Sequence, residues 1–97
     1  MENPVYKIKF TNVSLKDFEK LDKKTKEKII PELNLLSKSP FTLKKDIKKL
    51  KGLGANIYRL RTGDLRIIYF LSDLELVILR IIDRKDLVKV VTDIRFK

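Results

Sequence analysis

The sequence predicts a single α+β domain in which an αα-hairpin packs on a mainly antiparallel β-sheet. Three observations lead to this fold class. Residues 5–11 alternate apolar and polar side chains, as a half-buried strand does. Two segments with apolar residues at helical spacing follow between residues 14 and 38. Three β-rich runs separated by turn signals then fill residues 56–82, so we expect the order β-α-α-β-β-β with a short C-terminal helix, all within one domain spanning residues 1–97.

The first strand is expected to span Val5–Thr11, with the lysines facing outward. Its inward-facing side chains are predicted to be Tyr6, Ile8 and Phe10.

A helix is expected to follow this strand directly. Ser14-Leu15-Lys16-Asp17 resembles a capping box with Asp17 in the N3 place, so this helix is predicted to begin at Ser14 and to end near Asp22.

A second helix is predicted from about Thr25 to Lys38, where Ser39-Pro40 stops it. Pro31 lies inside this pattern and removes one helical hydrogen bond, so we expect a kink or a start delayed by one turn. The predicted buried stripe consists of Ile29, Ile30, Leu33 and Leu36.

Residues 41–55 have an unusual charge pattern. The spacing of Leu43, Ile47 and Leu50 fits a short helical turn, which a loop at Gly52-Leu53-Gly54 follows. Like charges at this density repel one another unless an anion screens them, so the pattern is equally consistent with an anionic partner and with an exposed lysine loop. The lysines of this segment are Lys44, Lys45, Lys48, Lys49 and Lys51, with Asp46 as the one acid.

The stretch Asn56–Phe70 reads as a tight β-hairpin with Gly63-Asp64 as its two-residue loop, because Gly63 can supply the positive φ of such turns. This register sets Arg61 opposite Arg66 and Arg59 opposite Ile68, so three arginines share one face of the ribbon. Like charges directly opposite one another are destabilising. Their convergence therefore indicates an anionic ligand, most simply a phosphate, and the alternative is an ordinary solvated face.

The run Leu65–Leu71 is strongly apolar and is predicted to be a central strand, with Glu75–Ile82 as its neighbour. A turn at residues 72–73 and one at residues 72–74 give opposite facing to that neighbour. We favour the three-residue turn, because it sets Arg80 opposite Arg66 and avoids burying Arg80 under the helices. Arg84 then shares this face just beyond the strand end.

The tail has apolar residues at helical spacing and is predicted to be a short helix, although its valines also allow an edge strand. These positions are Leu87, Val90, Val91 and Ile94.

Composition excludes several kinds of chemistry. The chain has no cysteine and no histidine, which removes thiolate nucleophiles, zinc–thiolate sites and the usual general base at neutral pH. No metal and no cofactor are therefore expected. The net charge of +10 indicates a polyanionic partner. No apolar run approaches the length of a membrane span and no signal peptide is evident, so we expect a cytoplasmic protein without membrane contact.

Two long motifs resemble the RelE/ParE superfamily of type II toxins. The stretch Asn56–Tyr69 is similar to the family pattern Tyr-Arg-Leu-Arg-x-Gly-Asp-Tyr-Arg-x-x-Tyr, and Leu79–Leu87 is similar to Leu-Arg-Val-Gly-His-Arg-x-Asp-x. Lys49-Leu50-Lys51-Gly52 also resembles the family's Lys-Leu-x-Gly. The element order matches over essentially the whole chain.

This resemblance implies a RelE-like fold and a toxin neutralised by a cognate RelB-like antitoxin in a hetero-oligomer. In the RelE branch, the toxin cleaves mRNA in the ribosomal A site, where a ribose 2′-OH attacks the adjacent phosphate. Carried over position by position, the resemblance implies catalytic roles for Arg59, Arg61, Arg66 and Arg84. The remaining basic residues expected to bind RNA are Lys45, Lys48, Lys49, Lys51, Arg80 and Lys85.

The chain departs from the pattern at Asp83, where the family has histidine, and at Val88, where it has tyrosine. Arginine is a poor general base, so the acid and base are unassigned. Candidates by location are Lys49, Lys51, Asp64, Tyr69 and Lys85. Two other functions stay open, which are a ParE-like toxin that binds DNA gyrase without chemistry of its own and a non-toxic RNA-binding domain.

Overall fold

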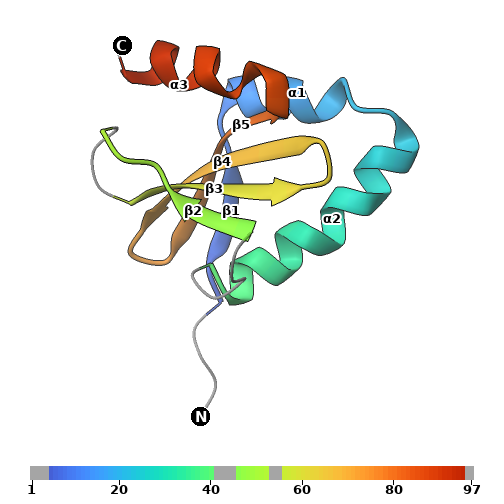
Figure 1. The fold of residues 1–97 in the computed structure, drawn as a ribbon. Helices are drawn as coiled ribbons and strands as arrows, with labels where there is room; N and C mark the ends of the chain where they lie inside the picture. The colour runs from blue at the N-terminus through green and yellow to red at the C-terminus, as the bar shows by residue number, and fades with distance from the viewer. Residues whose placement is uncertain (1–4, 41–45, 53–55, 96–97) are drawn as a thin grey trace.

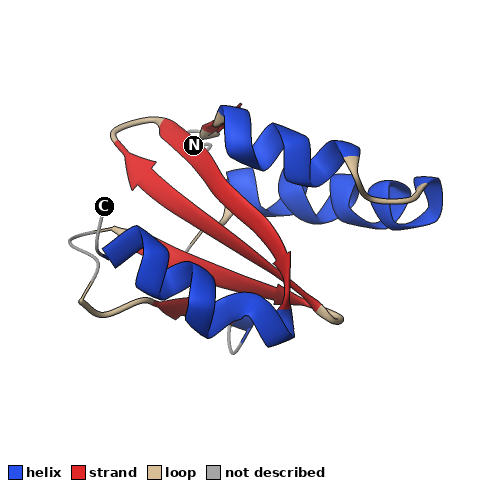
Figure 2. Ribbon diagram, turned by 90° about the horizontal axis from the view of Figure 1, so that it is seen from above, coloured by secondary structure: helices blue, strands red, loops and turns tan. Residues whose placement is uncertain are grey.

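A computed structural model of the chain describes residues 5–40, 46–52 and 56–95 (Figure 1). Its five strands form one sheet in the order β1-β5-β4-β3-β2. All neighbouring strands are antiparallel except β1 and β5. The sheet lies between the α1–α2 hairpin and α3 (Figure 2), so the predicted fold class is confirmed. The elements are β1 Lys7–Phe10, α1 Asn12–Glu19, α2 Lys23–Lys38, β2 Ile47–Lys49, β3 Ile57–Thr62, β4 Leu65–Ser72, β5 Glu75–Asp83, the 3₁₀ helix η2 Arg84–Asp86, and α3 Leu87–Arg95.

Helix α1 begins earlier than the sequence motif predicted. Thr11 is its N-cap, since the Thr11 hydroxyl oxygen accepts a hydrogen bond from the Ser14 N–H at 3.0 Å. The Ser14 hydroxyl in turn donates to the Thr11 carbonyl at 3.1 Å. The prediction that Ser14 caps the helix is therefore wrong, because Thr11 ends β1 in an extended conformation that already suits an N-cap.

Helix α2 begins at Lys23, with Asp22 as its N-cap, and runs through Pro31 to Lys38. Its start is not delayed, because a carboxylate oxygen of Asp22 accepts the Thr25 N–H at 2.9 Å and completes the first turn. The helix ends at Ser39, as the sequence predicted.

Two hydrophobic cores lie on opposite sides of the sheet. The larger core contains Ile29, Leu33 and Leu36 of α2 together with Leu60 and Ile67 of the sheet. We call this side of the sheet the helical face. The smaller core is formed by Ile57, Ile68 and Ile82 under Val90 of α3.

Two residues predicted to be buried are instead partly open to solvent. Ile30 is 48% exposed, because α2 directs it away from the sheet, and Phe10 is 36% exposed near the end of β1. Tyr6 and Ile8 pack against the larger core as expected.

The segment predicted as a helical turn contains a strand. β2 pairs with β3, with Ile47 opposite Leu60, and Ile47 packs against the larger core. The helical prediction is therefore wrong for residues 47–49, where strand pairing decides the conformation over local spacing. Leu43, Lys44, Leu53 and Gly54 lie outside the described residues.

The β3–β4 hairpin has the register that its turn residues predicted. Arg61 pairs with Arg66 and Arg59 with Ile68. Gly63 has a φ of 59°, which a side-chain-bearing residue rarely adopts. β4 is the central strand of the sheet, as expected.

The β4–β5 register differs from the prediction. Ser72 pairs with Glu75, so Asp73 and Leu74 form the turn, and a bulge between Ile68 and Tyr69 then shifts the pairing. Arg80 consequently lies opposite Ile68 rather than opposite Arg66. The predicted pairing is wrong because it allowed for neither this turn nor the extra residue that a bulge inserts into one strand.

The tail forms η2 and then α3, which confirms the predicted short helix rather than an edge strand. Val90 is 6% exposed, and Leu87 and Val91 pack around it, whereas the side chain of Ile94 lies outside the described part of the chain. Among the residues that the structure describes, no helix has the length and apolarity needed to cross a membrane.

Candidate functional site

The three hairpin arginines lie on the side of the sheet opposite α1 and α2. Successive side chains of a strand point to opposite faces. Because Leu60 and Ile67 are buried in the helical face, Arg59, Arg61 and Arg66 must point the other way. We call this side of the sheet the arginine face.

Arg84 joins this group through the hairpin turn. Its backbone N–H donates to the Asp64 carbonyl at 2.8 Å. Its side-chain Nε lies 3.9 Å from Asp64 Oδ1, and both side chains are well exposed. The structure thus brings Arg84 beside the end of the hairpin that carries Arg61 and Arg66.

The arginines differ in the acceptors that their guanidinium groups contact. Arg61 Nη2 contacts Asp46 Oδ1 at 3.1 Å. Arg66 Nη1 folds back and donates to the carbonyls of Gly63 and Leu65 at 3.0 and 2.9 Å. These contacts fix the two guanidinium groups next to the turn.

Arg59 is the exception. Within the described residues no acceptor contacts its guanidinium, which is half-buried between its neighbours. Burial, then Arg66 and Arg61, lower its pKa, whereas Asp46 acts in the other direction. Arg59 is therefore a partly desolvated positive charge whose guanidinium has no hydrogen-bond acceptor among the described residues, an environment that suits an anion-binding site.

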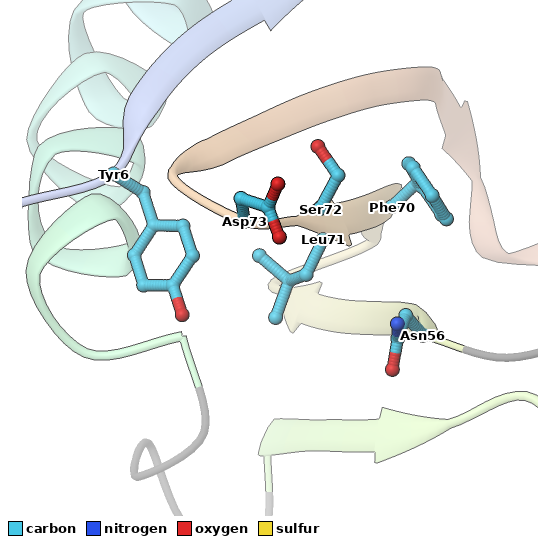
Figure 3. Close-up of a pocket in the computed structure, with 6 residues that line it drawn as sticks. All are labelled: Tyr6, Asn56, Phe70, Leu71, Ser72 and Asp73. Atoms are coloured by element: carbon cyan, nitrogen blue, oxygen red, sulfur yellow. The ribbon is translucent and has the colours of Figure 1, made fainter.

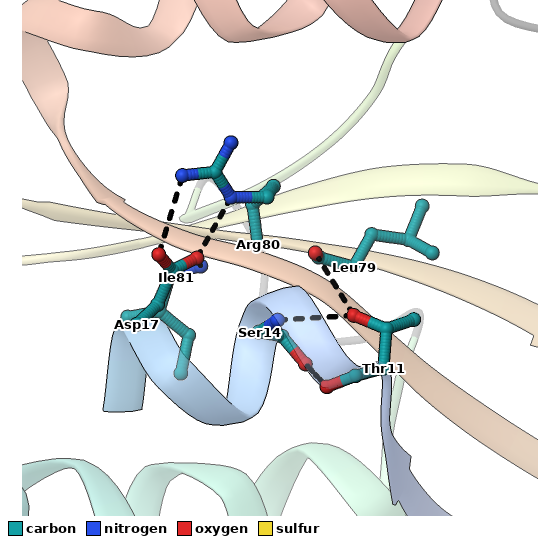
Figure 4. Close-up of polar contacts among 6 residues, drawn as sticks. All are labelled: Thr11, Ser14, Asp17, Leu79, Arg80 and Ile81. Atoms are coloured by element: carbon teal, nitrogen blue, oxygen red, sulfur yellow. Dashed lines mark hydrogen bonds and ion pairs between the residues drawn. The ribbon is translucent and has the colours of Figure 1, made fainter. Parts of the chain in front are cut away.

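Arg80 has a different environment, although the sequence grouped it with the RNA-binding residues. Its Nε and Nη2 donate to the two carboxylate oxygens of Asp17 at 2.8 and 3.2 Å (Figure 4). Asp17 Oδ2 also accepts the N–H of Ile81 at 3.0 Å. The hydrogen bond that Arg80 donates to Asp17 is the main cause that raises the pKa of Arg80.

This ion pair attaches α1 to the edge of β5 beyond the last residue paired with β1. Thr11 contributes there as well, since its hydroxyl donates to the Leu79 carbonyl at 3.3 Å (Figure 4). Reading Asp17 as a helix-capping residue concealed this structural role.

Lysines 48 and 49 of β2 lie on opposite faces. Lys48 pairs with Arg59, which puts it on the arginine face, whereas Lys49 pairs with Tyr58 and faces the other way. Lys51, just after β2, and Lys85, in η2, are exposed. Lys45 lies outside the described residues.

Tyr69 is remote from the arginines, although the sequence made it a candidate for proton transfer. It is fully buried in the helical face and stacks on Tyr58, with 5.6 Å between the ring centroids. Its hydroxyl donates to the Pro40 carbonyl at 2.9 Å. Burial raises the pKa of Tyr69, so this phenol is held protonated inside the core.

The described surface also has hollows away from the arginines. A pocket of about 350 Å³ lies beside the β4–β5 turn, and the residues that line it come from three separate segments of the chain (Figure 3). An apolar groove of about 270 Å³ runs between β1 and the two helices. The pocket is lined by Tyr6, Asn56, Phe70, Leu71, Ser72 and Asp73.

No group of three potential metal-ligating side chains occurs among the residues that the structure describes.

Comparison with known proteins connects this geometry to characterised molecules. A family model for the ParE toxin of the type II toxin–antitoxin system parDE matches residues 8–88. No curated protein sequence matches the chain.

Several solved structures are similar to it. The RelBE2 toxin–antitoxin complex from Mycobacterium tuberculosis is 27% identical with a TM-score of 0.68, covering 82% of this chain and 99% of that one. The RelE–RelB complex from Pyrococcus horikoshii is 28% identical with a TM-score of 0.70, covering 82% and 96%. The isolated RelE toxin of E. coli, at 20% identity and a TM-score of 0.68 over 89% and 98%, shares the fold.

Proposed function

The chain belongs to the ParE toxin family of type II toxin–antitoxin systems, within the RelE/ParE superfamily, and from this premise we propose that it is a ribosome-dependent mRNA endoribonuclease. One observation carries the proposal. Three arginines share a sheet face, a fourth lies beside their hairpin turn, and Arg59 has no acceptor within the described chain. That arrangement suits a phosphodiester, whose oxygens accept paired hydrogen bonds from guanidinium groups.

The proposed reaction is attack of a ribose 2′-OH on the adjacent phosphorus. A bond forms between the 2′-oxygen and phosphorus, and the bond from phosphorus to the 5′-oxygen of the next nucleotide breaks. The products are a 2′,3′-cyclic phosphate and a 5′-hydroxyl. Negative charge builds on the phosphoryl oxygens in the transition state, and fixed cations aimed at them lower the barrier.

The arginines divide this work according to their environments. Arg59 binds the phosphate directly, because its guanidinium is partly desolvated and has no hydrogen-bond acceptor among the described residues. Arg66, held against the turn carbonyls, keeps its remaining N–H groups oriented for a second oxygen. Arg84, whose pair with Asp64 is long and exposed, exchanges that partner for RNA at little cost.

The test maps mRNA ends in a translating extract with and without the protein. We expect new 5′ ends at defined codon positions, and their loss with Arg66→Ala and Arg84→Ala. The control is Lys24→Ala on the exposed side of α2, which should cleave normally. Intact mRNA with the wild-type protein would refute the nuclease proposal.

A second candidate is a ParE-like toxin that binds DNA gyrase. The description of the matching family model as ParE favours it, and so does the lack of histidine in the sequence. Inhibition of gyrase supercoiling with mRNA untouched would establish this function. If expression causes no growth arrest, both toxin functions fail and a non-toxic RNA-binding domain is left.

The proposed partner is a RelB-like antitoxin, because the similar structures from M. tuberculosis and P. horikoshii are toxin–antitoxin complexes. The apolar groove between β1 and the helices offers Phe10, Leu15 and Ile30 as exposed contacts. An amphipathic acidic segment of the antitoxin would fill this groove and continue onto the arginine face. We expect Ile30→Glu to weaken co-purification with the product of a neighbouring small open reading frame, and Lys24→Ala to leave it unchanged.

A further inference from the structure

Strand β2 widens the arginine face by one more strand. Asp46, just before β2, pairs with Arg61 at 3.1 Å, and Leu50, just after it, packs against the smaller core with Ile57. Because alternate residues share a face, Lys48 between them is fixed on the arginine face, opposite Arg59. Directly opposite residues of antiparallel strands have their Cβ atoms about 5 Å apart.

The reaction proposed above leaves a chemical need that the arginines do not meet. The departing 5′-oxygen needs a proton, and arginine holds its own too firmly to donate it. The sequence has no histidine, and the hydroxyl of Tyr69 is bonded to the Pro40 carbonyl inside the helical face. A lysine ammonium is a much stronger acid than an alcohol, so it can protonate this oxygen as the bond breaks.

We propose that Lys48 is the proton donor to the 5′-oxygen leaving group, an inference that rests on the nuclease function proposed above. The 2′-OH loses its proton to water as it attacks phosphorus. The Lys48 ammonium gives one proton to the 5′-oxygen as the phosphorus–oxygen bond breaks, and the neutral amine regains a proton from solvent. Arg59 binds the phosphate while its neighbour across the strand pair protonates the departing group.

The chain offers a matched control on the other edge strand of the sheet. Lys7 lies in β1, is also exposed and has the same charge, but β1 and β2 are at opposite edges of the sheet. We expect Lys48→Met to slow mRNA cleavage on programmed ribosomes by about 100-fold or more, and Lys7→Met to change it less than about threefold. Lys48→Arg, which keeps the charge without an available proton, should be nearly as slow as Lys48→Met.

The decisive substrate is a short mRNA with sulfur in place of the bridging 5′-oxygen at the cleaved linkage. A thiolate leaves without protonation, because a thiol is far more acidic than an alcohol. Lys48→Met should therefore cleave the sulfur linkage within a few-fold of the wild-type rate. A variant that is merely misfolded or weakly bound would be slow on both linkages.

The outcomes are distinct. If Lys48→Met cleaves the oxygen linkage at the wild-type rate, or is equally slow on both linkages, Lys48 is not the proton donor. Rescue by sulfur in Lys85→Met instead of Lys48→Met would also overturn the inference and assign the role to the exposed lysine beside Arg84. Failure of the wild-type protein to cleave either linkage would refute the nuclease function itself.

Discussion

The two faces of strand β3 carry side chains of opposite character, apolar and buried on one face and positively charged on the other. On the helical face, Leu60 is 1% exposed and packs with residues of α2 and β4. On the arginine face of the same strand, Arg59 and Arg61 lie beside Arg66, where like charges repel. The first face stabilises the fold by removing apolar surface from water. The second keeps charges together at a cost in stability, which is the usual condition of a binding site.

The sharpest way to test this comparison is to truncate one residue on each face of β3. Leu60→Ala should lower the free energy of unfolding by about 2–5 kcal/mol, because it leaves a cavity in the larger core. Urea titration followed by circular dichroism measures this. Cleavage per folded molecule should be retained, and equal losses of stability and activity would erase the distinction between the faces.

Arg59→Ala should show the reverse behaviour. Under the proposed nuclease function we expect cleavage to fall by about 10²–10³-fold, since the change removes a proposed hydrogen-bond donor to the charged transition state. The free energy of unfolding should stay constant or rise, because repulsion from Arg61 and Arg66 is relieved. A clear drop in stability would mean that Arg59 is a structural residue.

A third prediction concerns the two Arg–Asp pairs of β5 and its extension. Asp17→Ala should cost about 1–3 kcal/mol, because Arg80 and the Ile81 N–H both lose their acceptor in a partly buried place. The matched change Asp64→Ala should cost less than about 0.5 kcal/mol, because its 3.9 Å pair is exposed and screened. If Asp17→Ala and Asp64→Ala lowered the free energy of unfolding by similar amounts, burial would not explain a difference between the two ion pairs.

The smallest effect is a difference in response to pH. Hydrogen bonds from Thr25 lower the pKa of the Asp22 carboxyl in the folded chain. Its contribution is therefore complete above the unfolded pKa of about 3.9 and is lost as pH falls through the lowered folded value. Asp22→Asn keeps the cap without titrating. Its unfolding free energy should fall less between pH 7 and pH 3 than that of the wild-type protein, and equal falls would contradict the prediction.

The guanidinium groups of Arg59, Arg61 and Arg66 should not themselves titrate in this range, because arginine stays charged throughout.

The sequence was most informative where one local signal determined one structure. Gly63-Asp64 predicted the hairpin register, and that register alone brought Arg59, Arg61 and Arg66 together. The apolar spacing of α2 predicted Ile29, Leu33 and Leu36 as core residues. These features depend on periodicity and turn chemistry, which the residues themselves contain.

Three of the misses share one physical cause, which is competition from partners distant in sequence. Residues 47–49 form a strand because β3 pairs with them. The bulge that changes the pairing partner of Arg80 depends on how β5 pairs with β4. The local sequence suggested that Asp17 completes a helix cap. In the structure its carboxylate instead accepts hydrogen bonds from the Arg80 side chain and the Ile81 N–H of β5. Local pattern cannot reveal such contacts.

The parallel pairing of β1 with β5 has a consequence for how the protein is made. Thr11, at the end of β1, bonds to Leu79, which is 68 residues later in the chain. During synthesis, β1 and the helical hairpin leave the ribosome without the strand on which they dock, and Arg84 follows β5 only afterwards. The charged surface is therefore complete, with Arg84 beside the hairpin turn, only after the last strand of the sheet has emerged.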